Sequence, residues 1–236
     1  MTAPSLPALP EGWPRAIVFD LDGTLVDSAP DIRLAINAAF APLGIAPFEL
    51  EAVKSLIGGG APAAVARAAG MVGLALTPDE EKAALARFYP VYAEASAAGR
   101  GLYPGAIELL DRLAAHGLPL GLCTNKAQPI TEIAIEALGI GRYFRAVVGA
   151  RDDLPKKPDP APLLAAIQPL GAGPADVVMV GDTAADIGAA RAARVRSVAI
   201  GHGYSRVDIG ELGADAVIGS LGELPAALIA LARART

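Results

Sequence analysis

Short, strongly apolar runs alternate with helical stretches along most of this chain of 236 residues. The runs are rich in β-branched residues and end in polar ones, which is typical of strands buried on both faces of a sheet. The stretches between them have apolar residues at helical spacing, and several end at a glycine. This alternation predicts an α/β fold with a parallel sheet. We expect strands at 15–20, 118–125, 145–150, 176–182, 195–201 and 214–219.

The segment 28–100 breaks this rhythm, because it contains no convincing strand pattern. Ser28 and Thr77 each precede a helical stretch and have an acidic residue three positions on, a pattern typical of a capping box. A glycine-rich turn, IGGG (57–60), lies between the two stretches. The sequence therefore predicts a helical domain inserted after the first strand. We expect the chain to divide into a core domain, 1–27 with 101–236, and a helical cap domain, 28–100.

Composition excludes several classes of function. The net charge is −5 with no basic stripe, so we expect no nucleic-acid partner, and no apolar run is long enough to span a membrane. The first fifteen residues lack the basic and apolar regions of a secretory signal and are expected to form a short extended tail in a cytoplasmic protein. Cys123, His116 and His202 are too few to build a zinc cage. A bound metal would be oxygen-ligated, such as Mg²⁺.

Polar residues follow four of the expected strands or lie in the loop that comes next. In a parallel sheet, ligands bind outside the carboxyl ends of the strands, so these side chains are expected to converge. Carboxylates can hold Mg²⁺, and a lysine and a hydroxyl can hold a phosphoryl group, which together predict a phosphate-handling site. The residues are Asp20 and Asp22 after the first strand, Thr124 and Asn125 after the second, Lys156 and Lys157 after the third, and Asp182 and Asp186 after the fourth.

The stretches DLDGTLVD, CTN, KKPDP and GDTAAD resemble, in order and spacing, the four motifs of the haloacid dehalogenase superfamily. The helical insert resembles the C1-type cap that follows the first motif in one subgroup. This resemblance implies a Rossmann-like core with an all-helical cap. Within the superfamily, YPGAIELLDRLAAHG, the IGGG turn followed by Arg67, and AIGHGY are most similar to the phosphoglycolate phosphatase branch.

The resemblance also implies a role for each residue. Asp20 would attack phosphorus and form an aspartyl-phosphate, and Asp22 would serve as general acid and then general base. Thr124 and Lys157 would orient the phosphoryl oxygens with help from Asn125. On the cap, Gly59 and Arg67 would face the substrate. Mg²⁺ would be held by Asp20, the Asp22 carbonyl and Asp182, with Asp186 in the outer shell.

The expected substrate is a small phosphorylated metabolite, with 2-phosphoglycolate favoured. A β-phosphoglucomutase-type mutase and another sugar or nucleotide phosphatase remain enzymatic alternatives. A phosphate-sensing or partner-binding module remains a non-enzymatic one, and the chain could be a monomer or a homodimer. Of the residues outside the motifs, Asp27 is expected to order the passage into the cap, and His202 is a minor candidate for substrate contact. Tyr204 is expected only to pack.

Overall fold

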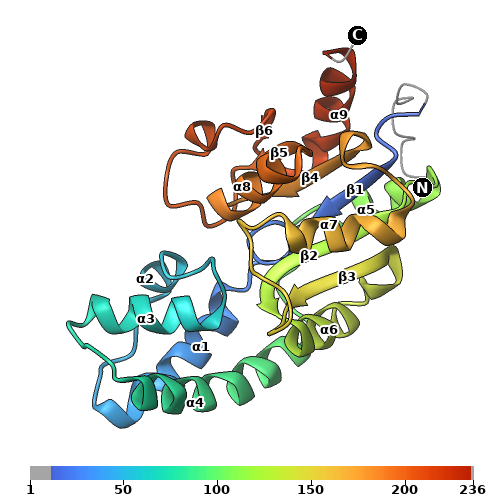
Figure 1. Cartoon of the computed structure of the whole chain (residues 1–236). Helices are drawn as coiled ribbons and strands as arrows, with labels where there is room; N and C mark the ends of the chain where they lie inside the picture. The colour runs from blue at the N-terminus through green and yellow to red at the C-terminus, as the bar shows by residue number, and fades with distance from the viewer. Residues whose placement is uncertain (1–11, 235–236) are drawn as a thin grey trace.

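The computed structural model describes residues 12–234, so residues 1–11 of the expected tail, 1–15, lie outside the described part. Trp13, which belongs to that segment, is buried in the core. Within the described part, six parallel strands form one sheet in the order β3-β2-β1-β4-β5-β6 (Figure 1). All six lie within two residues of the expected positions. They are β1 (Ala16–Phe19), β2 (Leu120–Ala127), β3 (Phe144–Ala150), β4 (Val177–Gly181), β5 (Arg196–Ile200) and β6 (Ala216–Ile218).

Helices cover both faces of the sheet, as a parallel sheet of apolar strands requires. Ile17 and Phe19 of β1 enter one apolar cluster, and Ala16 and Val18 enter another, because side chains alternate along a strand. The first cluster includes residues from α5 (Ala106–Ala115), α6 (Gln128–Ala137) and α9 (Leu224–Arg233). The second includes residues from α7 (Ala161–Ile167) and α8 (Ala184–Ala193).

The segment between β1 and α5 is helical and has its own apolar core. Its helices are α1 (Ala29–Phe40), α2 (Leu50–Lys54), α3 (Ala61–Met71) and α4 (Pro78–Ala97). Phe40, Phe88 and Val65 are buried together within it, and Ile130 and Tyr204 join the cluster from the sheet side. Figure 1 shows these helices set to one side of the sheet, with α4 running toward α6. We refer to α1–α4 and their connections as the helical cap.

The chain passes between sheet and cap through two segments that lie side by side. The amide of Asp27 donates to the carbonyl of Gly101 at 2.7 Å, and the amide of Tyr103 donates to the carbonyl of Leu25 at 2.9 Å. These two hydrogen bonds therefore hold the segments together where the cap begins and ends.

The two predicted capping boxes have different outcomes. Thr77 forms one with Glu80 at the start of α4, as expected. Ser28 stands at the N-cap of α1, but its hydroxyl makes no capping bond, so the second prediction was wrong. The amide of Ala29 instead donates to the Tyr204 hydroxyl at 3.0 Å and to Asp27 Oδ1 at 3.3 Å. No helix in residues 12–234 is both long and apolar enough to cross a membrane.

Candidate active site

The central position of β1 places Asp20 and Asp22 at the middle of the sheet's carboxyl edge. The amide of Asp20 donates to the carbonyl of Val180 at 2.9 Å, which extends the pairing with β4 to the first carboxylate. The backbone then turns at Gly23, which has a φ of +87°. A Cβ there would clash with the Asp182 carboxylate, so the turn requires glycine for both conformation and space.

Three buried carboxylates gather beside this turn. Oxygen atoms of Asp20, Asp182 and Asp186 all lie within 4.8 Å of one another. The Lys157 ammonium faces this cluster, 3.0 Å from Asp20 Oδ1 and 2.5 Å from Asp186 Oδ1, and also donates to the carbonyl of Cys123. The adjacent Lys156 is exposed. The loop after β3 therefore delivers a single buried lysine to the carboxylates.

Burial and mutual repulsion perturb these groups. Burial, followed by the nearby Asp186 carboxylate, raises the pKa of Asp20 from 3.8 to about 7, although Lys157 acts in the opposite direction. Burial also raises the pKa of Asp182 well above its ordinary value. Burial alone would lower the pKa of Lys157, but the carboxylates of Asp186 and Asp20 outweigh it and raise that pKa. Strong perturbation in a cavity is typical of functional sites.

The cluster has the properties of a site for a divalent cation. Three aspartates face one lysine here, so the cluster carries an excess of negative charge that a cation would offset. Asp182 is held by the Thr24 hydroxyl at 3.1 Å and the Tyr204 amide at 2.7 Å. Buried carboxylate oxygens held in this way suit a hard cation that prefers oxygen ligands.

Asp186 is engaged through both of its oxygens. One pairs with Lys157, and the other accepts from the amide of Thr183 at 2.9 Å and from its hydroxyl at 2.6 Å. These contacts close a capping box at the start of α8. Asp186 can therefore fix Lys157 and the end of β4 in addition to any part in metal binding.

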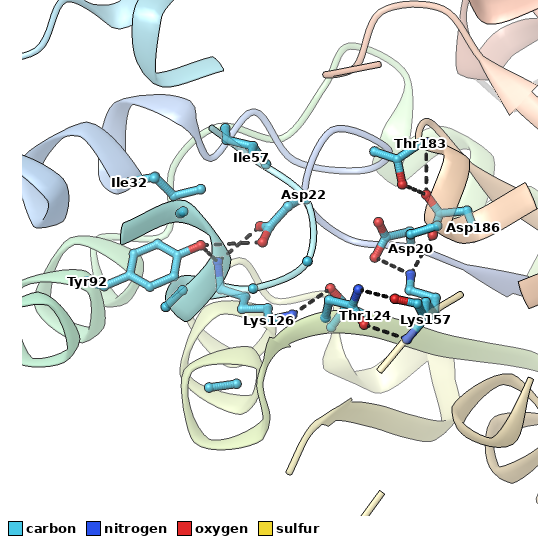
Figure 2. A pocket seen from close by; sticks show the side chains of 18 of the residues that line it. Asp20, Asp22, Ile32, Ile57, Tyr92, Thr124, Lys126, Lys157, Thr183 and Asp186 are labelled. Atoms are coloured by element: carbon cyan, nitrogen blue, oxygen red, sulfur yellow. Dashed lines mark hydrogen bonds and ion pairs between the residues drawn. The ribbon is translucent and has the colours of Figure 1, made fainter. Parts of the chain in front are cut away.

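Asp22 points away from this cluster. Its Oδ1 lies 3.0 Å from the Lys126 ammonium, and its Oδ2 accepts from the Tyr92 hydroxyl at 3.4 Å (Figure 2). Lys126 comes from the end of β2, and Tyr92 comes from α4 of the cap. Two carboxylates two residues apart thus have different partners, which allows them different chemical roles.

The residues after β2 support the loop that carries Lys157. The Asn125 side-chain amide donates to the carbonyl of Lys157 at 3.0 Å, and its oxygen accepts from the Lys157 amide at 2.9 Å. The Thr124 side chain is buried beside them and accepts from the amide of Lys126 at 3.3 Å. Both Thr124 and Asn125 line the cavity described next.

A cavity of about 50 Å³ lies between the cap and the carboxyl edge of the sheet. Asp20, Asp22, Lys157 and Asp186 line it from the core, and apolar side chains, among them Ile32, Ile57 and Phe88, line it from the cap. Asp182 is fully buried and is not among the residues that line the cavity. The cap therefore covers the polar groups with an apolar surface.

The IGGG turn brings the cap close to the core. Gly59 lines the cavity, and a Cβ on Gly60 would lie 2.8 Å from the carbonyl of Asn125. Arg67 does not line the cavity. Its Nη1 donates to the carbonyls of Leu56 at 2.6 Å and Gly58 at 2.7 Å, so it braces the turn from behind. The expectation that Arg67 contacts substrate stays a prediction.

Two residues near the passage into the cap also have defined positions. His202 stacks on Tyr103, with ring centroids 3.8 Å apart, and its Nε2 lies 3.1 Å from the carbonyl of Thr24, so it faces the core and not the cavity. The expectation that Tyr204 only packs was wrong. Its amide binds Asp182, and its hydroxyl donates to Asp27 Oδ1 at 2.5 Å.

Sequence reasoning missed Lys126 and Tyr92, which line the cavity and contact Asp22. Lys126 had a usable signal, since it directly follows Thr124 and Asn125 at the end of a strand. Tyr92 had none, because the FYPVY stretch reads as an ordinary apolar helix face.

Known proteins of one family resemble this chain. A model of haloacid dehalogenase-like hydrolases matches residues 14–194. The chain belongs to this family. A phosphoglycolate phosphatase from Rhodospirillum rubrum is 42% identical over 215 residues, which cover 89% of each chain. Another from Chromobacterium violaceum is 41% identical over 219 residues, covering 89% of this chain and 94% of that one.

Solved structures give the same family and fold. The crystal structure of a predicted phosphoglycolate phosphatase from Haemophilus somnus matches with a TM-score of 0.82 and 32% identity, covering 89% of this chain and 96% of that one. The structure of CbbY from Rhodobacter sphaeroides in complex with phosphate matches with a TM-score of 0.72 and 27% identity over the same shares of the two chains. This chain is therefore a haloacid dehalogenase-like hydrolase, and several of the proteins it resembles are named phosphoglycolate phosphatases.

Proposed function

We propose that this hydrolase is a Mg²⁺-dependent phosphatase that cleaves 2-phosphoglycolate through an aspartyl-phosphate intermediate. The observation that carries the proposal is the division of labour in one cavity, where Asp20 faces Lys157 and Asp22 faces Lys126 and Tyr92. The relatives named phosphoglycolate phosphatase support the choice of substrate.

In the first step, an Asp20 carboxylate oxygen attacks phosphorus, a P–O bond forms to Asp20, and the bond to the ester oxygen breaks. The leaving oxygen takes its proton from Asp22, which lines the same cavity but points away from Asp20. Lys157 and the Thr124 hydroxyl, which both come from residues that line the cavity, would bind the remaining phosphoryl oxygens. Asn125 holds the Lys157 backbone at both its amide and its carbonyl, so it fixes the ammonium's approach.

In the second step, Asp22 takes a proton from water, whose oxygen attacks phosphorus and displaces the Asp20 carboxylate as phosphate is released. Asp20, Asp182 and Asp186 are the side chains that would hold Mg²⁺, together with the Asp22 carbonyl. A bound divalent cation would offset the negative charge of the phosphoryl group and favour the ionised form of Asp20. The role of the Asp22 carboxylate is separate, because Lys126 draws it to the other end of the cavity.

The helical cap is proposed to move as a unit comprising residues 28–100, opening and closing through the paired passages at Asp27 and Gly101. Closure would exclude bulk water from the aspartyl-phosphate. The IGGG turn lies against Asn125, and Tyr92 contacts Lys126. Both contacts would be broken when the cap opens and made again when it closes. A cytoplasmic location remains an expectation from the sequence.

The test is phosphate release from a panel of small phosphomonoesters by the purified protein with Mg²⁺, alongside Asp20→Asn. We expect 2-phosphoglycolate to have the highest kcat/KM and Asp20→Asn to have no measurable turnover. Near wild-type turnover by Asp20→Asn, from a preparation free of other phosphatases, would refute Asp20 as nucleophile. Isomerised sugar instead of free phosphate from a sugar phosphate would favour the mutase alternative.

A further inference from the structure

The end of the cavity away from Asp20 contains a second buried cation, Lys126. Lys126 is one of the residues that line the cavity, and its side chain is only 2% exposed to solvent. The ammonium lies 3.0 Å from Asp22 Oδ1, 2.5 Å from the Tyr92 hydroxyl and 4.2 Å from the centre of the Tyr92 ring (Figure 2). A buried ammonium is costly unless it is paired, and Lys126 is paired with Asp22.

Lys157 and Lys126 are the cationic side chains that line the cavity within residues 12–234. Lys157 is committed to Asp20, Asp186 and the carbonyl of Cys123, where the phosphoryl group is proposed to bind. Lys126 has a single carboxylate partner, Asp22. An ammonium donates up to three hydrogen bonds, and Asp22 and Tyr92 accept two of them. A second anion in the cavity would therefore meet Lys126.

We propose that Lys126 binds the carboxylate of the substrate. Together with Tyr92, it selects phosphomonoesters in which the carboxylate is attached to the carbon that bears the ester oxygen. This inference rests on the proposed function and assigns its specificity. Asp22 must reach the leaving oxygen, and Lys126 touches Asp22 directly. An anion bound to Lys126 therefore lies within a few bonds of that oxygen, which fits a two-carbon 2-phosphooxy acid better than a long sugar phosphate.

The Tyr92 contribution makes the site depend on the cap. Tyr92 belongs to α4, whereas Lys126 ends β2, so their contact joins the two parts of the molecule across the cavity. The Tyr92 ring lies against the ammonium and restricts its position, as a cation–π contact does. A carboxylate that bridges to Lys126 would thus be held only when the cap is closed over the core.

Two other cations are less suitable for this role. Arg67 donates to the carbonyls of Leu56 and Gly58 and does not line the cavity. Lys156 is exposed, although a Cβ on Gly60 would lie 3.4 Å from its ammonium, which places it near the cavity-lining turn. Both serve as comparison positions in the test.

The test compares 2-phosphoglycolate with 2-hydroxyethyl phosphate, in which a neutral alcohol replaces the carboxylate. For Lys126→Met we expect kcat/KM for 2-phosphoglycolate to fall about 10–100-fold more than kcat/KM for the neutral ester, the range for losing a charge-assisted hydrogen bond. Loss of the cation beside Asp22 affects both esters, so the difference between them reports the contact with the carboxylate. Tyr92→Phe should show a smaller loss with the same selectivity. Lys156→Met, the matched removal of a neighbouring lysine charge, should leave the ratio of the two substrates unchanged.

Because Lys126→Met leaves Asp22 without its cation, binding is measured as well. The affinities of the two esters for Asp20→Asn, with and without Lys126→Met, are determined by calorimetry in Mg²⁺. Equal losses for both esters, in kinetics and in binding, would overturn the proposal, as would a carboxylate-selective loss in Arg67→Ala or Lys156→Met in its place. If Lys126→Met does not fold, Tyr92→Phe provides the test, and an equal loss for both esters in that variant would likewise overturn the proposal.

The two proposals fail in different ways. A wild-type enzyme that releases phosphate from both esters equally well overturns the carboxylate site and leaves the phosphatase assignment standing. A protein that hydrolyses no phosphomonoester refutes the proposed function. In that case the binding measurements decide on the carboxylate site. If Asp20→Asn binds 2-phosphoglycolate no more tightly than 2-hydroxyethyl phosphate, the carboxylate site is overturned too.

Discussion

Asp20→Asn is expected to make the metal-free protein more stable while it abolishes turnover. Burial and the Asp186 carboxylate raise the pKa of Asp20 from 3.8 to about 7 in the folded protein. A raised carboxyl pKa means that the folded state holds a proton that the unfolded state has released. The ionised carboxylate therefore lowers the free energy of unfolding as pH rises from about 4 to about 7, and the whole loss is present above pH 7.

The size of the effect follows from the same shift. Each pKa unit corresponds to about 1.4 kcal/mol, so a rise from 3.8 to about 7 corresponds to at most about 4 kcal/mol. Asparagine resembles the neutral acid and does not carry this charge. We expect the free energy of unfolding of Asp20→Asn to exceed that of wild type by a few kcal/mol at pH 8, and by little near pH 4.

The assay is urea unfolding in a chelating buffer at both pH values, with Asp152→Asn as a control that removes an exposed aspartate. The difference in free energy of unfolding between Asp152→Asn and wild type should be similar at the two pH values. In Mg²⁺ at a hundred times its Kd, the free energy of unfolding of wild type should rise by about 2.7 kcal/mol. The stability difference between the two proteins should then become smaller or change sign. An Asp20→Asn variant that is no more stable than wild type at pH 8 without metal would refute the electrostatic account of this cluster.

Three further predictions concern proton transfer, the metal and the passage into the cap. Asp22→Ala should lower turnover by about 10²–10⁴-fold, and formation of the aspartyl-phosphate should suffer less with a very good leaving group; equal losses with good and poor leaving groups would argue against a general acid. Because a proton on Asp20 competes with metal, the affinity for Mg²⁺ should weaken about tenfold per pH unit below about pH 7, measured by calorimetry, and a flat profile would contradict the raised pKa. Tyr204→Phe removes the hydroxyl that bonds Asp27 and the amide of Ala29, and should lower the free energy of unfolding by about 1–3 kcal/mol; an unchanged urea midpoint would show that this contact contributes nothing.

The family, the parallel sheet and the residues at its carboxyl edge could all be predicted from the amino-acid sequence. Strand and helix periodicities are local, so the positions of β1 and β2 could be read from short windows of residues. The rule that ligands bind at the carboxyl ends of parallel strands then placed Asp20, Thr124 and Asp186 near one another from the order of the strands alone. The motifs were informative because four of them follow that order.

The partner that each of these side chains faces depends on contacts between distant parts of the chain. Lys126 and Tyr92 are 34 positions apart, and Tyr204 lies 177 positions from Asp27, so no local pattern reports these contacts. A lysine after a strand reads as solvated until the cap is packed over it, and that packing leaves the Lys126 side chain 2% exposed. Asp20 and Asp22 also point in different directions because of distant partners. Asp20 pairs with Lys157, and Asp22 pairs with Lys126.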